Sequence, residues 1–364
     1  MKYINLSERV YIPMNNNPNY HDQLDIDNQL KLRDLLQNLP RFCKSFFYGI
    51  EPSTASRTRI AYAYDLTVFF NYIKENNPVY KDMDIQDIPI TILDELRVTD
   101  IEEYLQYLKV YSKDENLHTN REKGIKRKLS SLKSFYNYYF KSEQIKENPA
   151  AKVKVPKLHE KEIVRLEPNE VADLLDMVES GEKLTEKQKA FHEKTKLRDI
   201  ALMTLLLGTG IRVSECVGID INDIDFDNTG IKIRRKGGYE TIVYFSDEVK
   251  TALLNYLEER KKNIPAAGNE DAFFLSMQKK RMSVRSVENL VSKYSQLVTK
   301  LKHITPHKLR STYGTSLYRQ TGDIYLVADV LGHKDVNTTR KHYAAIEDER
   351  KWKARNAVKL RDDD

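Results

Sequence analysis

Six side chains in the second half of the chain suit phosphoryl transfer that needs no metal ion. They are two arginines, two histidines, a lysine and a tyrosine, at Arg212, Lys236, His307, Arg310, His333 and Tyr343. A phosphodiester under in-line attack develops negative charge on its non-bridging oxygens, and two fixed guanidinium groups can stabilise that charge. Arginine suits the task because its planar donors match phosphate oxygens bidentately and stay protonated. The set therefore predicts a metal-free site for phosphate chemistry.

The remaining side chains of the set can move protons and attack phosphorus. A tyrosine oxygen forms a covalent phosphotyrosine when a nearby base accepts its proton. His307 is a candidate for that base because histidine titrates near neutral pH. Lys236 precedes a Gly-Gly turn, from which it can protonate a leaving 5′-hydroxyl. The sequence contains no GxxxxGK[ST], HExxH or GxSxG motif, so we expect neither a cofactor nor a metal ion.

Each of these residues taken singly has a more ordinary explanation. Arg212 could be a surface arginine at a helix start, His333 a loop residue, and Tyr343 a half-buried aromatic. His307 and Arg310 are three residues apart on an expected helix and could form a surface pair. Only the order of all the motifs along the chain distinguishes a catalytic set from a coincidence.

That order resembles the catalytic domain of the tyrosine recombinase (phage integrase) family, with Xer-type recombinases similar in layout. The motifs are GTGIRVSE, RKGG, HKLR, LGH and KHYA, and the resemblance covers residues 42–346. It implies phosphate clamping by Arg212 and Arg310, acid catalysis by Lys236, proton transfer assisted by His307, a hydrogen bond to phosphate from His333, attack by Tyr343 and a structural role for Glu215. A frequent second histidine of the family is Ser311 here.

Three other tyrosines compete with Tyr343 for the role of nucleophile. Tyr313 and Tyr318 fall on the apolar helix expected after the HKLR motif, and Tyr325 precedes two apolar residues, so all three are predicted core residues. The polar segment 181–196 and the extended N-terminus resemble the longer single-protein Xer recombinases of Gram-positive bacteria.

The resemblance also implies the reaction and its partners. Strand cutting and rejoining would proceed through a 3′-phosphotyrosine and a Holliday junction, on double-stranded DNA with a specific recombination site. A homotetramer on paired sites and an accessory protein would be partners, and the role would be chromosome-dimer resolution in the cytoplasm, at the nucleoid. Integration or excision of a phage or conjugative element uses the same chemistry. A type IB topoisomerase-like enzyme would share the tyrosine chemistry, and a non-catalytic DNA-binding protein could share the fold.

Composition fits a two-domain protein without a membrane span. The chain has 364 residues, of which 40% are hydrophobic, and carries a formal net charge of +6. Its longest largely apolar stretch, residues 200–207, is far shorter than the roughly 20 residues that cross a bilayer. The two cysteines, Cys43 and Cys216, have neither disulfide-framework nor metal-site spacing, which is typical of a reducing cytoplasm.

Charge is segregated along the first half. Residues 82–103 include eight acidic and one basic side chain, whereas residues 116–161 include twelve basic and four acidic ones. Such a basic segment is commonly a solvated helix face, but the interleaved aromatics favour a structured element that contacts phosphates. The predicted DNA contacts are Arg121, Lys126, Arg127, Lys128, Lys133, Lys152 and Lys154.

The pattern of apolar residues predicts a mainly α fold with one small β-ribbon, and the resemblance implies that it is arranged as a two-domain DNA clamp. We expect an N-terminal extension (1–41) with a helix over 27–36, a helical core-binding, SAM-like domain (42–148), a linker (149–160), a catalytic domain (161–346) and a tail (347–364) that could dock on a neighbouring subunit. Further helices are expected from Ser56, from a capping box at Thr99 and Glu102, over 119–140, over 168–180 and over 198–207. Residues 181–196 are predicted to be an insertion or loop, and the ribbon spans 229–245.

Overall fold

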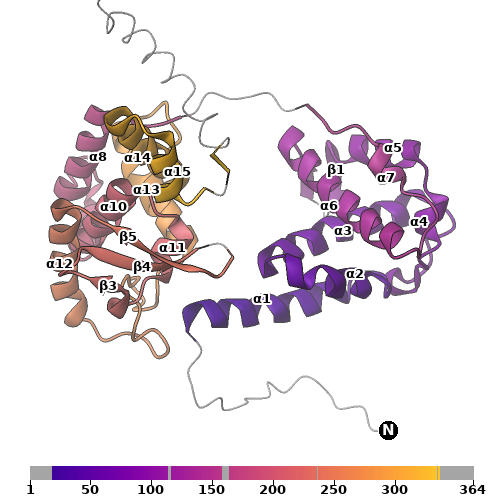
Figure 1. Cartoon of the computed structure of the whole chain (residues 1–364), viewed down its shortest axis with the longest axis horizontal. Helices are drawn as coiled ribbons and strands as arrows, with labels where there is room; N and C mark the ends of the chain where they lie inside the picture. The colour runs from indigo at the N-terminus through magenta and orange to yellow at the C-terminus, as the bar shows by residue number, and fades with distance from the viewer. Residues whose placement is uncertain (1–18, 114–115, 158–163, 236, 334, 337–364) are drawn as a thin grey trace, which may run out of the picture. The chain divides into compact units, whose positions relative to one another are not determined.

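The chain divides into two compact units, one of residues 1–161 and one of residues 162–364 (Figure 1). The structure, a computed structural model, describes residues 19–113, 116–157, 164–235, 237–333 and 335–336. Both units are mainly helical, and each has one small antiparallel sheet. The predicted fold class, mainly α with little β, is confirmed. No helix within the described ranges is both long enough and apolar enough to cross a membrane.

Unit 1 is a helical domain around an aromatic core. Its elements are α1 (Tyr20–Leu36), α2 (Cys43–Ile50), η1 (Glu51–Ser53), α3 (Ser56–Asn76), η2 (Ile85–Asp87), α4 (Ile92–Glu95), α5 (Val98–Tyr107), β1 (Val110–Lys113), β2 (Asn116–Thr119), α6 (Glu122–Lys141) and α7 (Pro149–Lys152). The Phe46, Phe70 and Tyr139 rings meet Phe135 of α6 edge to face, with centroids 5.1 to 6.0 Å apart. Burial of these large rings supplies much of the unit's hydrophobic stabilisation.

Two predicted helix starts in unit 1 are wrong for local reasons. Helix α1 begins at Tyr20 instead of residue 27, because Asn19 caps it by accepting a hydrogen bond from the Asp22 amide. Helix α5 begins at Val98, and the Asp100 carboxylate accepts a hydrogen bond from the Arg97 amide at 2.7 Å in place of the predicted capping box. Residues on either side of the predicted domain limits also pack in this core, including Leu36 of α1 and Ala150 of α7.

A hairpin of β1 and β2 was not predicted from the sequence. The strands pair antiparallel from Val110 with Thr119 to Lys113 with Asn116. All four residues of β2 are exposed, so the alternation of buried and exposed residues that identifies a half-buried strand is missing.

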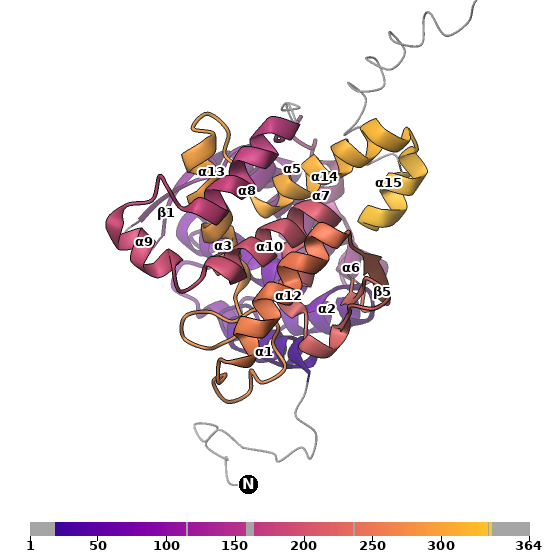
Figure 2. The ribbon, with the colours of Figure 1, turned by 90° about the vertical axis from the view of Figure 1, so that its left-hand side faces the viewer.

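Unit 2 places one apolar helix at its centre. Its elements are α8 (Pro168–Ser180), α9 (Glu186–His192), α10 (Lys196–Thr209), α11 (Val213–Gly218), η3 (Ile221–Asp223), β3 (Ile224–Asp225), β4 (Gly230–Arg234), β5 (Glu240–Tyr244), α12 (Asp247–Lys261), α13 (Val284–Val298), α14 (Pro306–Thr321) and α15 (Ile324–Leu331). Helix α10 packs against α8, α12 and α14 (Figure 2), which explains why apolar residues surround its axis on all sides. The predicted helix over 168–180 and the β4–β5 ribbon are confirmed.

The segment 181–196 contains a helix, although it was predicted as an insertion or loop. Thr185 and Gln188 form a capping box that starts α9. At the end of α9, His192 is buried, and its Nδ1 lies 3.0 Å from the Tyr294 hydroxyl of α13. Because the segment is rich in lysines and glutamates, its hydropathy pattern does not reveal that His192 is buried.

Candidate active site

Arg310 occupies the interior of unit 2. It lies on the first turns of α14, which starts with Pro306 at a position where the missing amide hydrogen has no helical acceptor. The Arg310 side chain donates through Nη1 to the Gly210 carbonyl at 2.6 Å and through Nη2 to the Leu331 carbonyl. The two acceptors belong to the C-terminal ends of α10 and α15, where carbonyls lack helical partners and the helix dipole is negative. These ends therefore stabilise a buried cation through main-chain oxygens.

Arg212 and Arg310 both donate hydrogen bonds to the segment in which α15 ends. It is the N-cap of α11, and its Nη2 donates to the Gly332 carbonyl at 3.2 Å. The carboxylate of Glu215 accepts hydrogen bonds from the Arg212 amide and from its Nη1, both at 2.8 Å. The Glu215 side chain is 3% exposed and that of Arg212 is 32% exposed. Glu215 thus fixes a guanidinium that still reaches solvent, as a phosphate clamp requires.

His333 follows the residue whose carbonyl binds Arg212, and His307 lies on the same helix as Arg310. His333 directly follows Gly332, which ends α15 in the left-handed conformation with a φ of 61°, and its amide donates to the Ala328 carbonyl at 2.8 Å. His307 is exposed on the first turn of α14, three residues before Arg310. The structure therefore brings Arg212, Arg310 and the start of the LGH motif together. The predicted general acid Lys236 and nucleophile Tyr343 lie outside the described residues.

Sequence analysis missed Arg235, which fastens the β4–β5 hairpin to α15. Its Nη2 donates to the Val330 carbonyl at 2.9 Å and its Nη1 to the Asp329 carbonyl at 3.3 Å. The side chain is buried, and its Nε makes no hydrogen bond to any residue that the structure describes. Gly237 and Gly238, with φ of 103° and 85°, form the turn that follows. Arg235 stands in a run of three basic residues, 234–236, and nothing in that run distinguishes it from its neighbours.

The last three carbonyls of α15 and that of its C-cap all accept hydrogen bonds from arginines. Arg235 binds those of residues 329 and 330, Arg310 that of residue 331, and Arg212 that of residue 332. A pocket of about 390 Å³ opens beside them and is lined by the hairpin, the end of α15, His333 and Tyr313 of α14. A helix end that would otherwise leave unsatisfied acceptors thus gathers three cations at one place.

The rival tyrosines differ in their surroundings. Tyr318 is buried, as predicted, and Tyr313 is half-buried, which raises the pKa of its hydroxyl and disfavours the nucleophilic phenolate. The prediction that Tyr325 is a core residue is wrong, because it is 71% exposed. Helix α15 buries Val327 and Leu331 instead, so Tyr325 faces away from the core.

Some of the predicted DNA contacts in unit 1 are basic side chains that bind other residues of the unit, and others lie at exposed or half-buried positions. Arg127 donates to the buried Asp65 at 2.5 Å, and the Nζ of Lys133 donates to the Val153 carbonyl at 2.8 Å. Lys128 is 8% exposed, its Nζ donates to Asn120 at 3.0 Å, and burial lowers its pKa. We therefore exclude Lys128 from the proposed phosphate contacts. By contrast, Arg121, Lys126, Lys152 and Lys154 occupy exposed or half-buried positions and remain in the proposal.

The fold and the arginine cluster define the class of protein. The profile of the phage integrase family matches residues 164–350, which is more than half of the chain. The chain belongs to this family of tyrosine recombinases, which are enzymes that transfer DNA strands. The resemblance predicted from the motif order is confirmed.

Within the family, the chain is similar to Xer recombinases. It is 30% identical to tyrosine recombinase XerS of Lactococcus lactis subsp. cremoris strain MG1363 over 328 residues, covering 81% of this chain and 91% of that protein. It is 31% identical to XerC of Caldanaerobacter subterraneus subsp. tengcongensis over 303 residues, covering 81% and 79%.

Two solved structures share the fold. The Tn1549 transposon integrase in complex with transposon right end DNA has a TM-score of 0.60 at 21% identity, covering 87% of this chain and 99% of that one. XerH bound to a palindromic difH substrate has a TM-score of 0.58 at 18% identity, covering 82% and 78%.

Proposed function

We propose that the chain is a site-specific recombinase that cuts and rejoins double-stranded DNA through a 3′-phosphotyrosine and a Holliday junction. The observation that carries this proposal is the convergence of Arg212 and Arg310 on residues 331 and 332, next to His333. Chromosome-dimer resolution is the proposed role, because the relatives XerS and XerC are Xer recombinases. Cytoplasmic action at the nucleoid follows from that role.

The proposed mechanism gives one task to each of five side chains of the set. The partly exposed Arg212 binds a non-bridging phosphate oxygen, and the buried Arg310 adds positive charge behind it. The Tyr343 oxygen attacks phosphorus and forms the new P–O bond while His307 accepts the tyrosine proton. The bond to the 5′-oxygen breaks, and Lys236 protonates that oxygen. The 5′-hydroxyl of a partner duplex later reverses these steps, so the phosphodiester bond energy is conserved.

The proposed domains and partners follow from the same assignment. The core-binding domain (42–148) and the catalytic domain (161–346) both bind duplex DNA at a specific recombination site. A homotetramer assembles on paired sites, and the tail (347–364) docks on a neighbouring subunit. An accessory protein is a further proposed partner.

A nicked suicide duplex tests the proposal. Incubated in EDTA with a duplex that carries the candidate site, the protein is expected to form an adduct that survives denaturation. Tryptic digestion then places the DNA on the peptide HYAAIEDER, residues 342–350, which contains Tyr343. An adduct on a peptide that contains Tyr313, Tyr318 or Tyr325 would refute the assignment. Tight binding without any adduct would favour a non-catalytic DNA-binding protein. Relaxation of plasmids that lack the recombination site would favour a topoisomerase-like enzyme.

Replacement of Arg235 by Ala is expected to slow adduct formation about ten- to a hundredfold. Two hydrogen bonds from a charged donor to α15 are lost, and each bond of this kind contributes about 1.5 to 3 kcal/mol. The hairpin that carries Lys236 is then no longer fastened beside His333. Lys232→Ala is the matched control, because Lys232 lies on the same hairpin with its Nζ 3.7 Å from Asp223 and far less buried. Equal single-turnover rates for the two variants would contradict the role.

Arg121→Gln is expected to weaken binding to DNA of any sequence and to lower the slope of log affinity against log salt by about one. Arg121 is exposed and occupies the N-cap position of α6, where the helix dipole also favours a phosphate. Lys128→Gln should leave the slope unchanged, because its ammonium is buried against Asn120. Titration by fluorescence anisotropy at several salt concentrations measures both slopes, and a lower slope for Lys128→Gln would return Lys128 to the set of phosphate contacts.

A further inference from the structure

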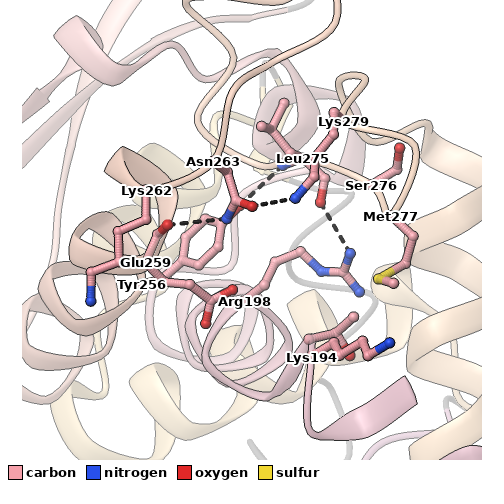
Figure 3. Close-up of a pocket in the computed structure, with 11 residues that line it drawn as sticks. Lys194, Arg198, Tyr256, Glu259, Lys262, Asn263, Leu275, Ser276, Met277 and Lys279 are labelled. Atoms are coloured by element: carbon pink, nitrogen blue, oxygen red, sulfur yellow. Dashed lines mark hydrogen bonds between the residues drawn. The ribbon is translucent and has the colours of Figure 1, made fainter. Parts of the chain in front are cut away.

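A second pocket lies at the N-terminal end of α10, the end opposite to the one that binds Arg310. Its volume is about 220 Å³, enough for roughly seven water molecules at about 30 Å³ each. Four separate segments of unit 2 line it: the α9–α10 connection, the first turn of α10, the end of α12 and the turn at residues 275–279 (Figure 3). Sequence analysis assigned no role to any of these residues.

Basic side chains dominate the lining of this pocket. Lys194, Arg198, Lys262 and Lys279 line it together with a single acidic residue, Glu259. Lys194 and Lys262 are exposed, and neither makes an ion pair with an acidic residue in the described part of the chain. Burial raises the pKa of Glu259. Like charges brought together by folding repel one another unless an anion joins them.

Arg198 is held in place before any ligand arrives. Its Nη1 donates to the Leu275 carbonyl at 3.0 Å, as Figure 3 shows, and its Nε and Nη2 donate to Asp199 at 3.0 and 2.6 Å. Asp199 is buried, so this pair forms a fixed floor for the pocket. A rigid guanidinium loses little conformational entropy when it meets an anion.

Two further features of the pocket favour a polar ligand. Lys279 has a φ of 59°, a left-handed conformation that is costly for a residue with a side chain, and its ammonium donates to Asn263. Ser276 also lines the pocket, and its hydroxyl is buried and makes no hydrogen bond to any described residue. An acceptor-rich ligand would satisfy the lysine ammonium groups.

We propose that this pocket binds a compact phosphate-bearing anion, either free pyrophosphate or the diphosphate of a nucleotide. Neutralisation of three lysines and the presence of a preset guanidinium favour a multiply charged oxyanion over a neutral ligand. The small volume favours one or two phosphate groups over an extended strand or peptide. The pocket is separate from the arginine cluster, because the pocket lies at the N-terminal end of α10 and the cluster lies at its C-terminal end.

Calorimetric titration of the full chain with inorganic pyrophosphate, at constant ionic strength, tests the proposal. The wild-type protein is expected to bind one pyrophosphate at this site, and Lys194→Gln/Lys262→Gln is expected to bind at least about tenfold more weakly. Both lysines are exposed, so this variant keeps the fold. Lys187→Gln/Lys300→Gln is the matched control, since these two lysines are exposed in unit 2 and lie outside the pocket.

Three outcomes would overturn the proposal. The first is equal affinity of the pocket variant and wild type, and the second is an equal loss in the control variant. The third is loss of binding in Arg212→Gln with retention in the pocket variant, which would place the anion at the arginine cluster. A parallel titration with ADP identifies the source: binding at least as tight as that of pyrophosphate indicates a nucleotide, and weaker binding indicates the free anion.

Discussion

Arg212→Gln is expected to lower the rate of covalent adduct formation by about a hundred- to a thousandfold, the loss typical for removal of one preorganised donor to a developing oxyanion. The guanidinium is held by Glu215 and by the Gly332 carbonyl, so its position is set before DNA arrives. Glutamine keeps a donor for Glu215 but carries no charge. Affinity for uncleaved DNA should change far less than the rate, because many other cations contact the backbone.

Single-turnover rates on the suicide duplex separate this effect from binding. Arg212→Lys retains the charge without the planar fork and should fall between wild type and Arg212→Gln. Arg285→Gln is the control, because Arg285 of unit 2 forms an exposed pair with Glu288 at 3.2 Å. A rate for Arg212→Gln within about threefold of that of Arg285→Gln would rule out a catalytic contribution of Arg212.

Asp199→Ala is expected to lower the free energy of unfolding of unit 2 by about 3 to 5 kcal/mol, because it leaves the Arg198 charge buried without its partner. The carboxylate is 1% exposed. It accepts hydrogen bonds from Arg198, from Thr195 at 3.1 Å and from the Tyr294 hydroxyl at 3.0 Å. In a unit of this size the Tm should fall by about ten degrees.

Thermal and urea unfolding measure this loss. Asp199→Asn keeps the shape and part of the hydrogen bonding, so we expect a smaller change than for Ala. Asp176→Ala on the exposed face of α8 is the control and should change stability by less than about 0.5 kcal/mol. A loss below about 1 kcal/mol for Asp199→Ala would mean that the buried network does not stabilise unit 2.

The motifs GTGIRVSE, HKLR and LGH each lie where a helix ends or begins, and local signals in the sequence mark those positions. Gly210 and Gly332 end α10 and α15 in the left-handed conformation, and Pro306 opens α14. These glycine and proline signals can be read from sequence without knowledge of the packing. The convergence of Arg212 and Arg310 depends both on where those helices end and on how α10, α14 and α15 pack.

Contacts between distant residues could not be predicted in the same way. Arg235 binds carbonyls that follow it by more than ninety residues, and a main-chain acceptor leaves no mark on the sequence. Asp65 and Arg127 are 62 residues apart, and nothing in the basic run around Arg127 distinguishes an arginine paired with a buried aspartate from a DNA contact. The buried His192 lies in a segment whose composition is otherwise that of a solvated loop.

The end of α15 has a consequence for how this region can change over evolutionary time. The acceptors at positions 329–332 are main-chain oxygens, and every residue type supplies one. Asp329 and Val330 can therefore drift to other residues while the arginines keep their anchors, whereas the arginines themselves cannot. A carbonyl also does not titrate, so the anchoring of Arg235 and Arg310 does not weaken between acidic and alkaline conditions. Each contact thus tolerates substitution of the residue that supplies the carbonyl but not substitution of the arginine.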